Sequence, residues 1–317
     1  MSTPQGVDRR IRRAARAACV ALAVAALPVL AQERPPGKLS VVVSILPQAY
    51  FVERVGGDRV SVDVLVGPGQ SPHTYDPTPR QLEGISHARV YFRIGIDFEN
   101  GLVPRIERMF KNVKVVDTRR NVPLRTMTAD EAEAEKSHAG HEEHGGHAEG
   151  DAAAGQPDPH IWLNPLLVKT QAQTICDTLA ELDPDHADTY RRNLAAFDAD
   201  LDRVHAQIAE ALAPLKGQAI FVFHPAFGYF TDAYGLKQIP VEIGGKEPTA
   251  RQLAGLIDRA KAAGVKVIFV QPQFARKSAG AVAAAIDGVV VPLDDLARDY
   301  LKNLEDVAAK VKAALQK

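Results

Sequence analysis

The chain has 317 residues, long enough for two domains of ordinary size, and its 38 lysine and arginine residues balance 39 aspartate and glutamate residues. This balance gives no electrostatic reason to expect nucleic acid or an anionic membrane surface as a partner, and we expect neither. Only Cys176 would remain after removal of an N-terminal signal that contains Cys19. The fold therefore cannot depend on an internal disulfide.

The N-terminus has the composition of an export signal. Five arginines within residues 9–16 precede an apolar run over 17–30, and Val-Leu-Ala at 29–31 resembles a cleavage site. The run is too short to cross a hydrocarbon layer about 30 Å thick as a helix. We predict a signal peptide over 1–31, cleaved on export to the periplasm. The arginines match a twin-arginine signal poorly, which leaves that route as the lesser alternative to general secretion.

Short apolar, β-branched runs alternate with helical patterns on both sides of the middle of the chain. Such runs suit parallel sheets covered by helices on both faces. We predict an α/β fold with two lobes, each with a mostly parallel sheet flanked by helices and each with its own core. The predicted strands cover residues 39–46, 60–66, 90–94, 113–116, 219–223, 238–243, 265–270 and 289–293, and two of the helices cover residues 250–263 and 279–286.

One long helix is predicted to join the two lobes. Over residues 190–212 the apolar residues recur at steps of three or four, and the pattern stops before a proline. A helix over 186–213 would be about 42 Å long and would connect an N-terminal lobe over 32–185 to a C-terminal lobe over 214–317. The alternative is a coiled-coil seam between two chains. The stripe is short for such a seam, so we favour a strut within a monomer.

Residues 129–157 differ from their surroundings, because alanine, glutamate, glycine and histidine dominate and β-branched residues are absent. Such a composition predicts a mobile loop in the N-terminal lobe. Its histidines could form a secondary, weak metal site, or the loop could be a solvated linker. Ordering a loop around a metal costs chain entropy, so we expect no essential role. The four histidines are His138, His141, His144 and His147.

Three other histidines, His73, His160 and His224, each stand beside a proline and are separated by 87 and 64 residues. Ligands so far apart can meet only if the fold gathers several loops at one cleft. Neutral imidazole is a good ligand for zinc, and a tetrahedral site needs a fourth partner. Asp294 and Asp295 follow the last predicted strand, at the edge where parallel sheets bind ligands, so either could supply a carboxylate.

Six runs of the sequence read SPHTYDPTPRQL, DPHIWLNP, FVFHPAFGYF, VEIGGKEPTARQL, VQPQFARKSA and VPLDDL. Together they resemble the zinc and manganese substrate-binding proteins of bacterial ABC transporters, in that family's usual order and over nearly the whole chain after the signal. The resemblance implies a binding protein outside the cytoplasm. Two α/β lobes, joined by a long helix, would hold one divalent metal between them and deliver it to an inner-membrane permease with its ATPase.

The resemblance also implies a ligand set. By motif, His73, His160 and His224 fall on the family's first three ligands and Asp294 on its carboxylate ligand, while Asp295 replaces the proline that usually follows. Zinc members are similar to this chain in having histidine at the third position, where manganese members tend to carry a carboxylate. Three imidazoles and one carboxylate also suit zinc better than manganese, which prefers more oxygen ligands. The histidine-rich loop resembles an insert common in the zinc members.

Three other functions are alternatives to zinc delivery. The nearer alternatives are a carrier of manganese or another divalent metal in the same family, and a periplasmic zinc buffer or chaperone without a transporter. A zinc hydrolase would need a base and an open coordination position, and residues 141–144 read H-E-E-H, one residue short of the zinc-protease spacing. A fourth protein ligand would close the site, so we predict a carrier and no enzyme.

Overall fold

The computed structural model describes residues 37–136, 155–241, 250–262, 264–274 and 276–316. The predicted signal peptide and the four histidines of the histidine-rich loop lie outside these ranges. Among the helices that are described, none is both long and apolar enough to cross a membrane.

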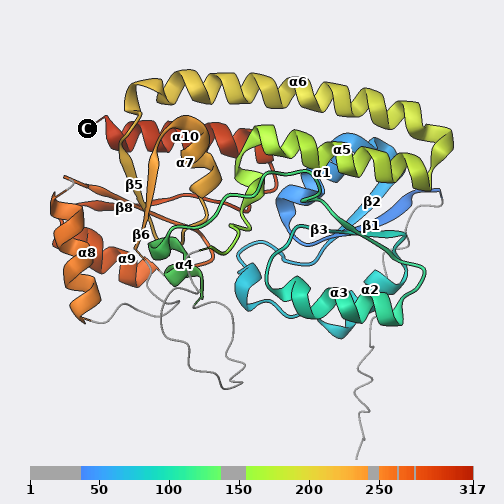
Figure 1. Ribbon diagram of the computed structural model, residues 1–317, viewed down its shortest axis with the longest axis horizontal. Coiled ribbons are helices and arrows are strands. Elements are labelled where there is room, and N and C mark those ends of the chain that lie inside the picture. The colour runs from blue at the N-terminus through green and yellow to red at the C-terminus, as the bar shows by residue number, and fades with distance from the viewer. Residues whose placement is uncertain (1–36, 137–154, 242–249, 263, 275, 317) are drawn as a thin grey trace, which may run out of the picture. The chain divides into compact units, whose positions relative to one another are not determined.

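Two four-stranded parallel sheets form the framework, which confirms the predicted fold class (Figure 1). Their orders are β2-β1-β3-β4 and β6-β5-β7-β8, so the second sheet repeats the connectivity of the first. In each sheet the strand order therefore reverses between β1 and β3, or between β5 and β7. Open α/β sheets bind ligands at such a reversal, beyond the carboxyl ends of the strands. The strands are β1 Leu39–Val43, β2 Val60–Val64, β3 Val90–Arg93, β4 Lys114–Asp117, β5 Ala219–Val222, β6 Lys237–Pro240, β7 Val267–Val270 and β8 Val289–Pro292.

Both faces of each sheet are covered, because alternate side chains of a strand point to opposite sides. In β1, Val41 and Val43 join the largest core cluster, whereas Val42 packs into a smaller one that includes Leu102 of α3 and Ile85 of α2. The second sheet likewise directs alternate residues toward α7 and toward α9. These helices are α1 Leu46–Gly56, α2 Pro79–Ser86, α3 Phe98–Met109, α5 Pro165–Leu182, α7 Gly228–Tyr234, α8 Ala250–Ala262, α9 Arg276–Ala285 and α10 Tyr300–Leu315.

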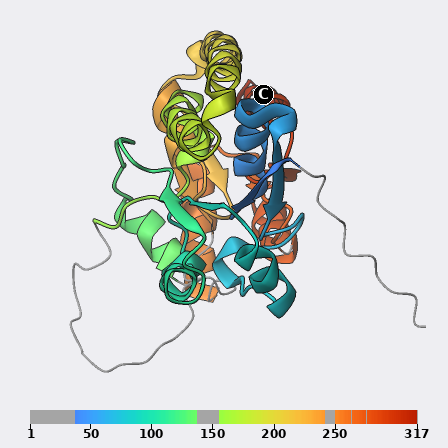
Figure 2. The same ribbon diagram turned by 90° about the vertical axis from the view of Figure 1, so that its right-hand side faces the viewer.

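The predicted long helix is present as α6, Ala187–Leu212, with 26 residues. It lies along α5 and α10 in Figure 1, and Figure 2 shows it nearly end-on beside α5; it also contacts α1. All seven apolar residues of its stripe are buried within the chain, as the strut prediction required. Residues Pro36–Lys317 form one compact unit, so the lobe boundaries at 185/186 and 213/214 stay predictions.

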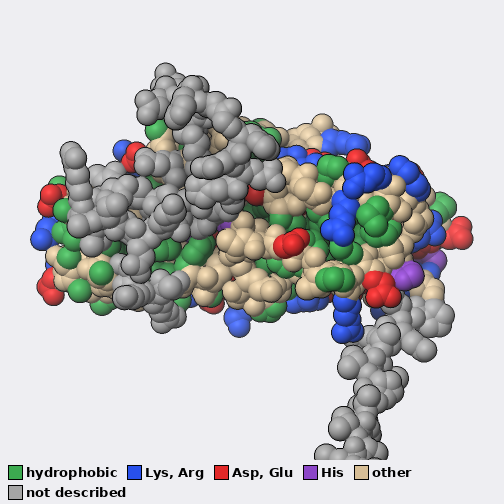
Figure 3. Space-filling view, turned by 90° about the horizontal axis from the view of Figure 1, so that it is seen from below, with side chains coloured by type: hydrophobic (Ala, Val, Ile, Leu, Met, Phe, Trp, Pro, Cys, Tyr) green, Lys and Arg blue, Asp and Glu red, His purple; other side chains and the backbone are tan. Residues whose placement is uncertain are grey.

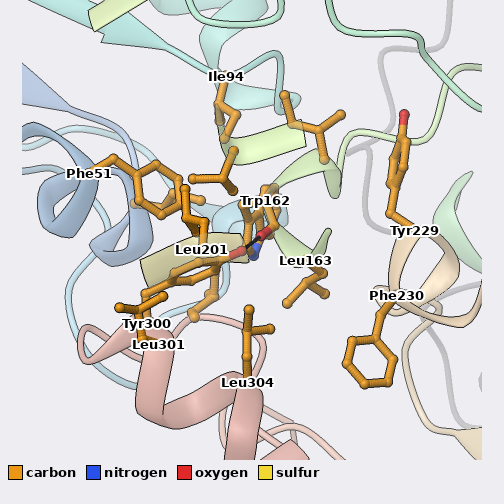
Figure 4. Close-up of a cluster of buried hydrophobic side chains, with 14 of the residues drawn as sticks. Phe51, Ile94, Trp162, Leu163, Leu201, Tyr229, Phe230, Tyr300, Leu301 and Leu304 are labelled. Carbon is orange, nitrogen blue, oxygen red and sulfur yellow. Dashed lines mark hydrogen bonds between the residues drawn. The ribbon is translucent and has the colours of Figure 1, made fainter. Parts of the chain in front are cut away.

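The prediction of a separate core for each lobe is wrong for the largest core cluster, which includes residues from both sheets. Each half also has a smaller buried cluster of its own. Trp162 is a fully buried member of the largest cluster and lies near Phe51 of α1, Leu201 of α6 and Tyr300 of α10 (Figure 4). The ring of Phe51 meets that of Tyr300 edge to face at 4.8 Å. The shared helix α6 and the return of α10 beneath it bring the apolar faces of the two halves together.

The predicted loop over 129–157 is wrong at its start, where Ala129–Lys136 form helix α4. Thr128 and Glu131 make a capping box: the Glu131 N–H donates to Thr128 Oγ1 at 3.3 Å, and the Glu131 carboxylate accepts from the Thr128 N–H at 2.9 Å. Ala132 is fully buried, and α4 packs beside β6. The Thr-x-x-Glu pattern was a start signal that the composition of the segment obscured.

The face seen from below carries charged side chains of both signs with hydrophobic side chains between them (Figure 3). Helix α3 exposes Arg105 and Arg108 to solvent, while Leu102 and Ile106 of the same helix are buried. This polarity is that of a helix covering one face of a sheet.

Candidate metal centre

His73 lies after strand β2, in a short 3-10 helix over Pro72–Thr74. The backbone N–H of His73 donates to Ser71 Oγ at 3.3 Å, which fixes the start of this turn. The residue is 9% exposed, and its Nδ1 lies 3.9 Å from a carboxylate oxygen of Asp97. A strand end followed by a capped turn therefore brings this imidazole inside the molecule.

His160 immediately precedes a second 3-10 helix, Ile161–Leu163, and is 1% exposed. Asp158 Oδ1 accepts from the His160 backbone N–H at 2.9 Å and lies 2.8 Å from His160 Nδ1. A carboxylate is an acceptor only, so this contact puts the ring proton on Nδ1 and leaves Nε2 with a lone pair. Asp158 therefore prepares the imidazole to bind a cation through Nε2.

His224 follows strand β5 after a single intervening residue, Phe223, and is 1% exposed. Gln271, at the end of the neighbouring strand β7, accepts from the His224 N–H at 3.2 Å and donates to its carbonyl oxygen at 2.7 Å. The side chain of Gln271 thus extends the sheet by one pair of hydrogen bonds and fixes the backbone from which the imidazole projects.

The three imidazoles meet at one point. His224 Nε2 lies 3.1 Å from His73 Nε2 and 3.2 Å from His160 Nε2, and the three histidines could hold one metal ion through ring nitrogens within 4.8 Å of one another. A tetrahedral zinc site with bonds of 2.0 to 2.1 Å has nitrogens about 3.3 to 3.4 Å apart. The two spacings to His224 are therefore close to those of a zinc site. The prediction that the three distant histidines converge is confirmed.

Neither aspartate after β8 belongs to this three-histidine group within the described residues. Asp294 accepts from the Leu296 N–H at 2.8 Å and lines a pocket of about 410 Å³ together with Leu46. Asp295 is 3% exposed and accepts from Gln273 Nε2 at 2.7 Å. Burial raises the pKa of Asp295 to about 6, opposed by the Gln273 hydrogen bond and by the electrostatic effect of His160.

Several residues that support the histidines were missed in the sequence. Asp158 was visible beside His160 in the run DPHIWLNP, two residues before the histidine. Gln271 stands in the run VQPQFARKSA, and its contact with His224 depends on the pairing of β5 with β7, which no local pattern in the sequence indicates. Trp162 donates from its indole to the Asp295 carbonyl oxygen at 2.7 Å, so it links the segments of His160 and Asp295.

Two parallel sheets with a buried cluster of three imidazoles define a class of protein, an α/β metal-binding protein with a candidate site for one divalent cation. The family model described as zinc-uptake complex component A, periplasmic, or ZnuA, matches residues 41–314. The chain belongs to this family.

Individual relatives agree with the assignment. The high-affinity zinc uptake system protein ZnuA of Brucella suis is 32% identical over 311 residues, which cover 87% of this chain and 92% of the relative. ZnuA of Bacillus subtilis is 30% identical over 272 residues, covering 82% and 79%. The zinc-binding lipoprotein AdcA of Streptococcus pneumoniae is 28% identical over 277 residues, and the chain spans about half of it, 53% of its length.

Solved structures agree as well. A crystal structure of ZnuA is 40% identical, with a TM-score of 0.77, and the match covers 88% of this chain and 99% of the other. A deletion mutant of ZnuA with zinc bound is also 40% identical, with a TM-score of 0.75 and coverage of 88% and 98%.

Proposed function

We propose that this protein captures one zinc ion at His73, His160 and His224 and delivers it to an ABC-type importer. The observation that carries the proposal is the convergence of three Nε2 atoms at 3.1 and 3.2 Å. Two neutral rings can share only one proton across such a contact, whereas a cation can accept all three lone pairs at once. Imidazole-rich sites favour zinc over manganese, which prefers oxygen ligands.

The fourth ligand is proposed to be a carboxylate from the segment after β8. Asp294 keeps the motif position and is our first choice. Asp295 is the alternative, since it is buried, accepts a hydrogen bond from Gln273 and is close enough to His160 for the two to interact electrostatically. The zinc affinities of Asp294→Asn and Asp295→Asn, measured side by side, decide which aspartate is the ligand. Only the variant that lacks the ligand should bind zinc more weakly and change the coordination of bound cobalt.

Family membership supports a proposal for the partner and the compartment. We propose that a cleaved signal peptide over 1–31 takes the protein to the periplasm, where it serves, as a monomer, an inner-membrane permease and its ATPase. Membership of a family of uptake components supports carriage rather than hydrolysis. A manganese carrier or a zinc buffer without a transporter remains the alternative. Growth under zinc limitation that requires both this protein and a permease would favour delivery over buffering.

Calorimetry on the purified protein tests the site. We expect one zinc per chain in the wild type, weaker binding of manganese, and loss of zinc affinity in His224→Ala. The loss should exceed about 100-fold, because residues that only support a ligand already cost 10- to 100-fold. His87→Ala, at an exposed histidine outside the cluster, is the matched control. Equal zinc affinity in His224→Ala and His87→Ala would contradict the proposal.

A further inference from the structure

Arg125 is a largely buried cation that contacts three carboxylates. Its side chain is 15% exposed. Nη1 donates to Asp158 at 2.6 Å, Nη2 donates to Glu131 at 3.0 Å, and Nε donates to Asp232 at 3.0 Å. Asp158 and Glu131 are 0% and 3% exposed, whereas Asp232 is 59% exposed. Two of the three ion pairs are therefore shielded from water. Away from water, attraction between charged groups is stronger and holds their geometry more firmly.

The first buried pair leads to His160. Asp158 uses Oδ2 for Arg125 and Oδ1 for the backbone N–H and the Nδ1 of His160. The backbones are joined too, because the Asp158 N–H donates to the Arg125 carbonyl oxygen at 3.0 Å. Tyr229 closes the arrangement: its hydroxyl accepts from the Arg125 N–H at 3.0 Å and donates to the Asp158 carbonyl oxygen at 3.1 Å.

The second buried pair leads to the turn after His224. Glu131 accepts from Gln238 Nε2 at 2.8 Å, and the same nitrogen lies 3.1 Å from the Pro225 carbonyl oxygen, to which it donates. The Oε1 of Gln238 accepts from the Phe227 N–H at 2.6 Å. Pro225 and Phe227 belong to the turn that His224 begins, so this turn is held on one side by Gln238 and, through Gln238, by the Arg125 ion pair.

We propose that Arg125 is a positioning residue for the metal site, which orients His160 through Asp158 and the turn of His224 through Glu131 and Gln238. This inference rests on the proposed function, because the imidazoles that it positions are the proposed zinc ligands. One guanidinium, supplied by the segment between β4 and α4, thus connects two histidines that are 64 residues apart in the sequence. Arginine suits this role because its planar fork can address three acceptors in fixed directions, which a lysine ammonium cannot.

The test separates the two buried ion pairs of Arg125 from its exposed ion pair. Asp232→Asn removes only the exposed pair and should leave zinc affinity unchanged. Glu131→Gln removes the charge that pairs with Arg125 on the side of Gln238, and it should weaken zinc binding. Glutamine can still complete the capping box of α4. Arg125→Lys and Arg125→Gln should weaken zinc binding by about 10- to 100-fold, as expected for groups that support a metal ligand. Of the two variants, Arg125→Gln should bind zinc more weakly.

Two spectroscopic readouts distinguish positioning from a general loss of stability. The absorption bands of bound cobalt should shift in Arg125→Gln and stay unchanged in Asp232→Asn. In metal-free protein, nitrogen-15 spectra of the imidazoles should place the His160 proton on Nδ1 in the wild type, and should report a mixture of tautomers in Arg125→Gln. The second readout needs no metal, so it tests Arg125 even if the protein carries no zinc.

The matched control is Arg54, another partly buried arginine. It pairs with Asp200 at 2.8 Å and lies over the ring of Phe197. Neither contact involves one of the three histidines. Arg54→Lys and Arg54→Gln should reduce the free energy of unfolding without changing the zinc affinity, the cobalt spectrum or the His160 tautomer. Unchanged zinc affinity and an unchanged tautomer in both Arg125→Gln and Glu131→Gln would overturn the inference. Zinc binding that is absent in the wild type would instead overturn the proposed function.

Discussion

At the scale of single residues, Gly228 occupies a position where a side chain has no room. A Cβ built there would collide with Arg125 Nη1 and would lie 2.6 Å from Asp158 Oδ2. Gly228→Ala must therefore displace the ion pair behind His160, although alanine is the better helix former. We expect a loss of about 1 to 3 kcal/mol in the free energy of unfolding, typical of overpacking, measured by urea denaturation.

Gly101 provides the control for that substitution. It is an exposed helical glycine in α3, and a Cβ there would meet nothing within 4 Å. Gly101→Ala should stabilise the protein by roughly 0.5 to 1 kcal/mol, because glycine loses more backbone entropy in a helix than alanine does. Equal effects of the two substitutions on the free energy of unfolding would show that Arg125 and Asp158 can move aside without destabilising the protein.

Glu99 is a fully buried carboxyl group at the start of α3, and its charge state should make stability depend on pH. Burial raises its pKa above the ordinary value of 4.5, although hydrogen bonds from Ser44, Ile94 and Gly95 oppose the shift. A raised pKa means that the folded state holds the proton more tightly than the unfolded state does. The contribution of Glu99 to stability is thus present below pH 4.5 and declines as the pH rises through the raised value.

Comparison with Glu99→Gln isolates this contribution, because glutamine does not titrate. The difference in unfolding free energy between the wild type and Glu99→Gln should shrink as the pH increases above about 4.5. Urea denaturation of metal-free protein at several pH values measures it. A difference that grows with pH would mean that the hydrogen bonds to the carboxylate outweigh its burial.

The three histidines could be predicted from the sequence because each stands in a short run with strong local signals. The residues that orient them could not be predicted in the same way. Asp158 lies close to His160 in the sequence, but its pairing with Arg125 depends on an antiparallel bridge between Thr126 and Pro157. Contacts between segments so far apart leave no periodicity or spacing in a single sequence.

At the scale of elements, helix α6 is the clearest case in which pattern determined structure. Its apolar stripe predicted a helix over 186–213, and the helix covers Ala187–Leu212. The strands were also predicted, but several end earlier than expected: β1 ends at Val43, whereas apolar sequence continues to Leu46. Residues after a strand remain apolar because they enter the core as the chain turns into the next helix, so composition alone overestimates strand length.

The stripe of α6 should contribute strongly to stability. Leu201 is fully buried in the core cluster that includes residues of both sheets. Leu201→Ala should lower the free energy of unfolding by about 2 to 5 kcal/mol, through lost burial and the cavity left behind. Gln207→Ala, at an exposed position of the same helix, should stay within about 0.5 kcal/mol. A small effect at both positions would indicate that α6 contributes little to the joint core.

At the scale of the whole molecule, zinc should stabilise the protein by mass action, since the three-histidine cluster exists only in the folded chain. At one hundred times the dissociation constant, zinc should add about 2.7 kcal/mol to the free energy of unfolding. Thermal denaturation with and without zinc measures the gain. His224→Ala should show none of it, and acidic buffer should reduce it because protons compete for the imidazole nitrogens.

The joint core has a further consequence for how the molecule unfolds. Val43 of the first sheet, Leu201 of α6 and Phe269 of the second sheet belong to one buried cluster. Two halves that share a core cannot lose their packing independently, so we expect one cooperative transition for metal-free protein. Calorimetry should give equal calorimetric and van't Hoff enthalpies. Two resolved transitions would contradict this, and would mean that the contacts under α6 hold the halves together without coupling their stability.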